Sequence, residues 1–101
     1  MQTEQEQRIK NNILIAQFMG LDWELFTPSI TVNYLVNGNY YEAHELSYNI
    51  SWDWLIPVIH KCFEVAEDCE MVDIMHNLQV AEKTDTYIAV IEFIKNYNLK
   101  N

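Results

Sequence analysis

Glycine, cysteine and basic residues are all scarce in this chain, and each shortage excludes a class of function. Two glycines in 101 residues cannot form the glycine-rich loops that hold phosphate groups, and no Gly-x-Gly-x-x-Gly or Walker sequence is present. The two cysteines, Cys62 and Cys69, are too few for the disulfide framework of a small secreted domain, so we expect both to be reduced. No apolar run approaches the roughly 18–20 residues that a membrane-spanning helix needs.

The shortage of basic residues gives the chain a strong negative charge. Six basic residues stand against fifteen acidic ones, for a formal charge of −9. This charge opposes contact with nucleic-acid phosphate or an anionic membrane, so we expect no direct binding to nucleic acid and no membrane association. It favours encounter with a basic protein partner, although acidic side chains also simply keep small proteins soluble.

What is present is enough apolar sequence for one core. Half of the residues are apolar and 13% are aromatic, and a chain of this length is close to the commonest domain size. We therefore expect a single domain over residues 1–101. The polar, acidic N-terminus lacks the basic region of a secretory signal, which predicts a cytoplasmic protein.

Two local signals predict an N-terminal helix followed by a β-hairpin. Thr3 and Glu6 have the spacing of a capping box, so the helix should begin near residue 4, and Gly20 should supply the left-handed residue that ends it. After an irregular stretch that contains Trp23 and Phe26, residues 29–46 form a hairpin around Asn37-Gly38. Its apolar face holds Ile30, Val32, Tyr34, Val36, Tyr41 and Ala43, and its polar face holds Thr31, Asn33, Leu35, Tyr40, Glu42 and His44.

The second half of the chain is predicted to be helical. Ser51 can cap a helix over residues 52–65, which Pro57 should kink. A short helix over 69–78 follows, with an edge strand over 71–75 as the alternative. A polar loop over 81–84 leads to a last helix, which has Asp85 as its N-cap and runs to about Tyr97. The fold class is α+β: an N-terminal helix, a two-stranded antiparallel hairpin, then two or three helices packed on one face of the hairpin.

Three separated stretches of the chain carry a family resemblance. They are NNILIAQFMG from Asn11 to Gly20, SWDWLIPVI from Ser51 to Ile59, and TYIAVIEFIKNYN from Thr86 to Asn98. Together they resemble the phage ABA sandwich domain family, small proteins of phages and prophages, notably of Bacteroidetes. The resemblance implies a layered α/β fold and a phage origin, and it implies no activity.

Candidate chemical groups are few. His60, Cys62, Cys69 and His76 lack the paired spacing of a zinc site, and on a helix His60 and Cys62 point roughly 200° apart, so we expect no metal and no cofactor. Cys62 with a histidine, or paired carboxylates such as Glu42 with Glu45 or Glu64 with Asp68, could serve as catalytic groups only in a cleft, which a chain this small rarely forms alone. We expect no enzyme.

Two surfaces are candidates for partner binding. The first is an acidic cluster at the junction of the second and third helices, made of Glu64, Glu67, Asp68, Glu70 and Asp73. The second is the polar side of the hairpin, with Tyr40, Glu42 and His44. Unpaired hairpin edges could also accept a strand from a partner or from a second copy, so a homodimer is an open alternative.

Charge, the lack of catalytic motifs and the family resemblance together give a functional hypothesis. The chain is expected to be a phage-encoded inhibitor that acts in the host bacterial cytoplasm and binds a host defence nucleic-acid enzyme through an acidic surface. An RNA-guided CRISPR nuclease of type VI-B or II-C is the favoured target, which would make the chain an anti-CRISPR protein. The alternative is a phage accessory or assembly protein that acts as a homo-oligomeric interaction module without an enzyme target.

Overall fold

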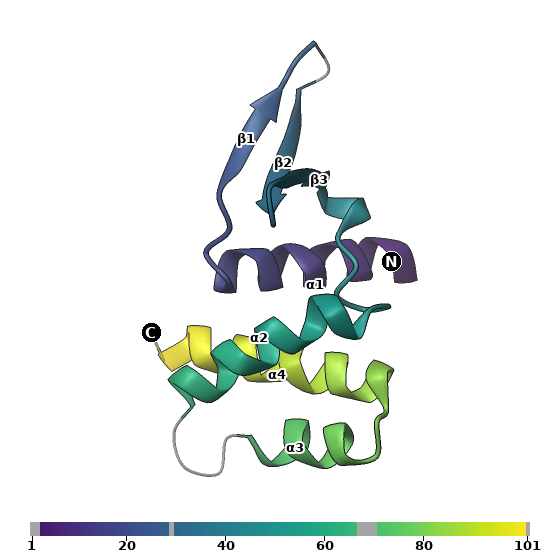
Figure 1. Cartoon of the computed structure of the whole chain (residues 1–101), viewed down its shortest axis with the longest axis vertical. Coiled ribbons are helices and arrows are strands. Elements are labelled where there is room, and N and C mark those ends of the chain that lie inside the picture. Colours follow the sequence, from purple (N-terminus) through teal and green to yellow (C-terminus); the bar gives the residue numbers. More distant parts are fainter. Residues whose placement is uncertain (1–2, 29, 67–70, 101) are drawn as a thin grey trace. The chain divides into compact units, whose positions relative to one another are not determined.

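The computed structural model describes residues 3–28, 30–66 and 71–100, without the side chains of Asp73 and Lys100. Contacts within the chain divide it into two compact units, Met1–Leu46 and Ser47–Asn101. The first unit holds a long helix and a three-stranded sheet, and the second is helical (Figure 1). The α+β class is as predicted, whereas the single domain and the packing of the later helices on the hairpin stay predictions.

Helix α1 (Glu4–Phe18) begins and ends as its sequence predicts. The Thr3 hydroxyl oxygen accepts a hydrogen bond from the Glu6 N–H at 3.1 Å, which satisfies one of the free donors of the first turn. Gly20 has φ +67°, and the Leu21 N–H donates to the Ala16 carbonyl at 3.1 Å. The left-handed Gly20 and this hydrogen bond are features of a Schellman motif, which caps carbonyls at the end of α1.

One buried polar side chain ties α1 to the end of the first unit. Asn12 is fully buried, and its Nδ2 donates to the carbonyl of Leu46 at 2.9 Å. Leu46 follows the short 3-10 helix η1 (Ala43–Glu45), which contacts α1. The amide therefore joins two segments that lie 34 residues apart in the sequence.

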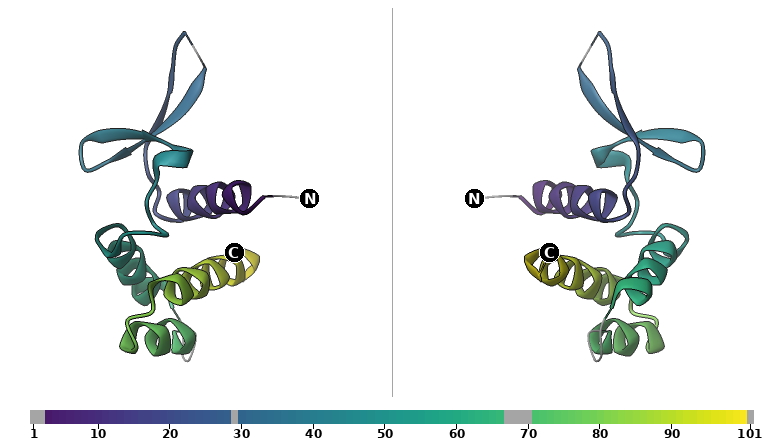
Figure 2. Two further views of the ribbon diagram at one scale, coloured as in Figure 1. Left: turned by 90° about the vertical axis from the view of Figure 1, so that its right-hand side faces the viewer. Right: turned by 90° about the vertical axis from the view of Figure 1, so that its left-hand side faces the viewer.

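The sheet has three strands rather than the predicted two. Strands β1 (Trp23–Phe26), β2 (Thr31–Val36) and β3 (Asn39–Glu42) are antiparallel and lie in the order β1-β2-β3. The prediction of an irregular stretch at Trp23–Phe26 was wrong, because these four residues gain their hydrogen bonds from β2, a partner that local sequence does not reveal. Figure 2 shows the β1–β2 ribbon extending away from α1.

The hairpin between β2 and β3 has the predicted turn and register. Asn37 and Gly38 both have positive φ, at 50° and 85°, as a type I′ turn requires. Tyr34 faces Tyr41 across the two strands. The predicted strand runs too far, because β3 ends at Glu42 and the chain turns into η1, so Ala43 lies in η1 and not on the apolar face of the hairpin.

The second unit is built from helices α2 (Trp52–Val65), α3 (Val72–Gln79) and α4 (Lys83–Lys100). The bounds of α2 are those predicted, although the Ser51 side chain makes no cap bond and only its carbonyl accepts from the first turn. Residues 72–79 form a helix, so the alternative of an edge strand over 71–75 was wrong. Figure 1 shows α4 beside both α2 and α3, and buried side chains from all three helices make the core: Leu55, Val58, Ile59, Cys62, Ile74, Val90, Ile91 and Ile94.

The turn between α3 and α4 differs from the predicted polar loop. Ala81 has φ +55°, and the Glu82 N–H donates to the Asn77 carbonyl at 3.0 Å, so an alanine takes the left-handed position of a Schellman motif. This tight turn lets α4 begin at Lys83, two residues before the predicted N-cap Asp85, and it runs to Lys100 rather than Tyr97. No helix within the described ranges is long and apolar enough to cross a bilayer.

Candidate binding surface

Strand β1 forms one edge of the sheet, and its free backbone groups can be assigned. The Leu35 N–H donates to the Asp22 carbonyl at 2.8 Å, next to the β1–β2 ladder in which Trp23 faces Tyr34. Residues of an antiparallel pair alternate between hydrogen-bonded and non-hydrogen-bonded positions. The backbone groups of Glu24 and Phe26 therefore point to β2, and those of Trp23 and Leu25 point outward at the edge.

The side chains on one face of this edge form an exposed apolar surface, here called the apolar face. It consists of Trp23, Leu25, Val32 and Tyr34. Trp23 and Leu25 are 57% and 56% exposed, whereas Tyr34 is 9% exposed. Contiguous apolar patches are rarely exposed on soluble monomers, and those that are exposed often mark interaction sites.

A hollow of ≈ 480 Å³ opens on the apolar face beside the end of α1. We call it the apolar hollow; its lining residues are Ala16, Gln17, Gly20, Leu21, Trp23, Val32 and Tyr34. The Schellman turn at Gly20 places the start of β1 next to this helix end. The lining is mostly apolar, so the hollow suits a hydrophobic side chain.

A second hollow, of ≈ 470 Å³, carries carboxylates and is called the acidic hollow. It is lined by Leu21, Asp22, Trp23, Glu24, Leu35 and Tyr40. Partial burial, together with the nearby Glu24 and Asp22 carboxylates, raises the pKa of Tyr40. The Phe26 ring packs edge-on against the Tyr40 ring, with centroids 5.1 Å apart. Two carboxylates beside aromatic rings suit a lysine or arginine side chain.

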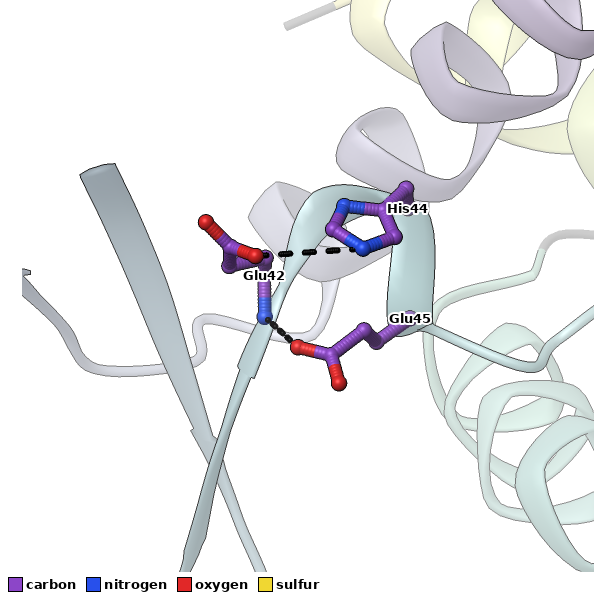
Figure 3. A group of neighbouring side chains, drawn as sticks. All are labelled: Glu42, His44 and Glu45. Carbon is purple, nitrogen blue, oxygen red and sulfur yellow. Dashed lines mark hydrogen bonds and ion pairs between the residues drawn. The ribbon is translucent and has the colours of Figure 1, made fainter. Parts of the chain in front are cut away.

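Glu42, His44 and Glu45 form a further polar group where β3 passes into η1 (Figure 3). The Glu42 N–H donates to Glu45 Oε1 at 2.9 Å as part of a capping box, and His44 Nε2 lies 3.8 Å from Glu42 Oε2. Their ligand atoms lie within 4.8 Å of one another, so the group could hold a cation. The capping box alone accounts for the position of both carboxylates, because each serves the first turn of η1.

The predicted site residues fall into separate groups. Tyr40 lines the acidic hollow, and Glu42 follows it on the same face of the sheet. His44 is exposed but lies in η1 rather than on a strand, so its assignment to the polar side of the hairpin was wrong. Of the predicted acidic junction, Glu64 is exposed near the end of α2. Glu67, Asp68 and Glu70 and the side chain of Asp73 lie outside the described residues.

Cys62, the cysteine that the structure describes, is poorly placed for nucleophilic chemistry. Cys62 is fully buried, and burial raises its pKa to about 12. The neighbouring His60 is exposed on α2, in a different environment from Cys62, as a helical spacing of two residues dictates. At neutral pH the Cys62 thiolate, which is the reactive form, is therefore essentially unpopulated.

The residues that sequence reasoning missed are those of β1 and the residue before it. Asp22, Trp23, Glu24 and Leu25 were not among the predicted site residues, because their stretch was read as irregular. One available signal was composition, since no lysine or arginine occurs between Lys10 and Lys61. No family model, no curated protein and no solved structure matches this chain, so the resemblance to the phage ABA sandwich domain family stays a prediction.

Proposed function

We propose that this chain is a binding protein for a basic protein partner, and that the unit Met1–Leu46 carries the binding surface. The observation that carries the proposal is the acidic hollow, in which Asp22 and Glu24 lie with Tyr40, on an edge strand that also exposes Trp23 on its other face. Aromatic anchors combined with complementary charge are typical of protein interfaces. The formal charge of −9 extends the same preference over the whole chain.

The partner class follows from charge and from the family resemblance. The grooves of nucleic-acid enzymes are among the most basic protein surfaces, so a host RNA-guided CRISPR nuclease of type VI-B or II-C is the proposed target of a phage-encoded inhibitor in the host cytoplasm. A homo-oligomeric phage accessory protein is the alternative, because an unpaired strand edge can also accept a second copy. Sedimentation of the purified chain separates the two: a stable oligomer that binds no such effector would support the alternative.

The direct test is binding of the purified chain to purified type VI-B and II-C effectors over a series of salt concentrations. We expect binding that weakens as salt rises, because screening reduces attraction between opposite charges. The double variant D22N/E24Q should weaken binding about 10-fold at low salt, since two exposed charge contacts contribute roughly 1–1.5 kcal/mol.

The charge-matched control is E64Q/E92Q, which removes two exposed carboxylates from the unit Ser47–Asn101. This control should leave binding within about 2-fold, because it spares the acidic hollow. Equal losses in the two double variants would mean that net charge alone acts. A loss confined to the control would assign binding to the helical unit and refute the proposed surface.

A further inference from the structure

Within the described residues, the outer edge of β1 has few of the devices that usually protect an edge strand: it is short and carries the single charge of Glu24. Proteins block exposed edges with lysine, proline, bulges or covering segments. Trp23–Phe26 contains neither lysine nor proline, and the β1–β2 ribbon extends away from α1 (Figure 2). Two residues at this edge, Trp23 and Leu25, present backbone donors and acceptors together with exposed apolar side chains.

The two hollows border the same strand but differ in chemistry. The apolar hollow is lined by Val32 and Tyr34, and the acidic hollow by Asp22, Glu24 and Tyr40. Side chains of an extended segment point alternately to opposite faces. A segment that alternates apolar and basic residues would therefore place one kind of side chain toward each hollow while its backbone pairs with β1.

A second copy of the chain fits this edge less well. If two β1 strands paired in antiparallel fashion through the outward groups of Trp23 and Leu25, Glu24 would lie opposite its own copy, Asp22 or Phe26, depending on the register. The first two registers bring like charges together. Like charges directly opposite each other destabilise a strand pair. A basic segment instead brings opposite charges together at the same positions.

From the edge, the two hollows and their charges, we infer that β1 binds an extended segment of its partner as an added strand. Apolar side chains of that segment lie toward the apolar hollow, and a lysine or arginine lies in the acidic hollow. The basic character of this segment rests on the proposed function above. Strand addition of this kind derives affinity from backbone hydrogen bonds and specificity from alternate side chains.

The first test uses the capped peptide Lys-Val-Lys-Val-Lys-Val, observed by amide chemical shifts of the ¹⁵N-labelled chain. We expect the largest shifts from Asp22 to Phe26. The matched peptides Glu-Val-Glu-Val-Glu-Val and Lys-Ser-Lys-Ser-Lys-Ser, which lack the charge and the apolar side chains respectively, should each bind at least about 10-fold more weakly. Equal binding of all three peptides, or shifts confined to residues 47–101, would overturn the inference.

The second test separates strand pairing from other modes of binding. Two versions of the lysine–valine peptide carry N-methyl groups on all valines or on all lysines, so only one version loses the amide hydrogens that point to β1. Loss of binding by the valine-methylated version indicates antiparallel addition, and loss by the lysine-methylated version indicates parallel addition. The loss should be about 10-fold or more. Equal behaviour of the two versions would overturn the inference.

A variant pair tests the same point on the protein. Leu25→Pro removes an outward N–H without touching the β1–β2 ladder, whereas Leu25→Ala removes the side chain and keeps the N–H. Leu25→Pro should bind the peptide more weakly than Leu25→Ala by about 5-fold or more, with far-UV circular dichroism confirming that both fold. If the effector binds both variants equally, strand addition is refuted while the proposed function stands. If the wild-type chain binds no basic partner, the proposed function fails whatever the peptides show.

Discussion

The buried amide of Asn12 gives the sharpest test of what holds the first unit together. Its Nδ2 donates to the Leu46 carbonyl at 2.9 Å, and both residues are almost completely buried. Replacing Asn12 with alanine leaves that buried carbonyl without this donor. Replacing it with leucine removes the same bond but keeps the volume filled.

The expected free energies follow from the two kinds of loss. An unsatisfied buried carbonyl costs about 1–3 kcal/mol, and the space left by alanine adds roughly 1 kcal/mol. Asn12→Leu should therefore lose about 1–3 kcal/mol and Asn12→Ala about 2–4 kcal/mol. Asn12→Asp should lose most at neutral pH, because its buried carboxylate would face a carbonyl oxygen, and it should recover in acid where the protonated group can donate.

Urea unfolding followed by far-UV circular dichroism measures these differences. For a chain of this size a loss of 2 kcal/mol lowers the urea midpoint by about 1 M. In Asn12→Asp, burial would raise the pKa of the new carboxyl in the folded state above its value in the unfolded chain. The loss of unfolding free energy relative to wild type should therefore grow as pH rises through the folded pKa. Midpoints for Asn12→Ala and wild type that agree within about 0.2 M would refute the role assigned to the amide.

Further predictions concern alkaline pH and the α3–α4 turn. Burial raises the pKa of Cys62 and Tyr48 to about 12, from 9.0 and 10.0, so the contribution of their protonated forms is complete below about pH 9 and is lost as pH rises toward 12. The free energy of unfolding should fall by up to about 1.4 kcal/mol per pH unit for each group. In Cys62→Ala this fall should be smaller between pH 9 and 10. Equal urea midpoints at pH 8 and pH 11 would contradict the prediction. Ala81→Gly should stabilise the chain by about 0.5–1 kcal/mol because Ala81 has φ +55°, whereas Ala81→Val should destabilise it, and a lower thermal midpoint for the glycine variant would count against the left-handed turn.

Local signals predicted much of the fold because they act within a few residues. The Thr3 cap, the Asn37-Gly38 turn and the bounds of α2 all depend on neighbours in sequence, and all three match the structure. Strand β1 could not be found this way. Residues 21–25 alternate between apolar and acidic side chains, but so short a run does not distinguish a strand from a loop, and only pairing with β2 makes Trp23–Phe26 a strand.

The candidate site was only partly predictable for the same reason. Tyr40 and Glu42 were found because the Asn37-Gly38 turn fixes the register of β3. Asp22 and Glu24 join Tyr40 only through the register between β1 and β2, which depends on tertiary structure. Ala81 likewise gives no sequence signal for a helix end, because alanine rarely adopts the left-handed conformation that it has here.

The exposed apolar side chains at the edge of β1 also have a practical consequence for handling the protein. Because Glu24 lies at this edge, its charge is one of the features that keeps free chains from pairing edge to edge and growing into larger aggregates. Near the isoelectric point of about 4.5 the net repulsion between chains vanishes while the apolar side chains stay exposed. Colloidal stability should therefore be lowest in mildly acidic or concentrated salt buffers, and a dilute neutral buffer is the natural choice for storage.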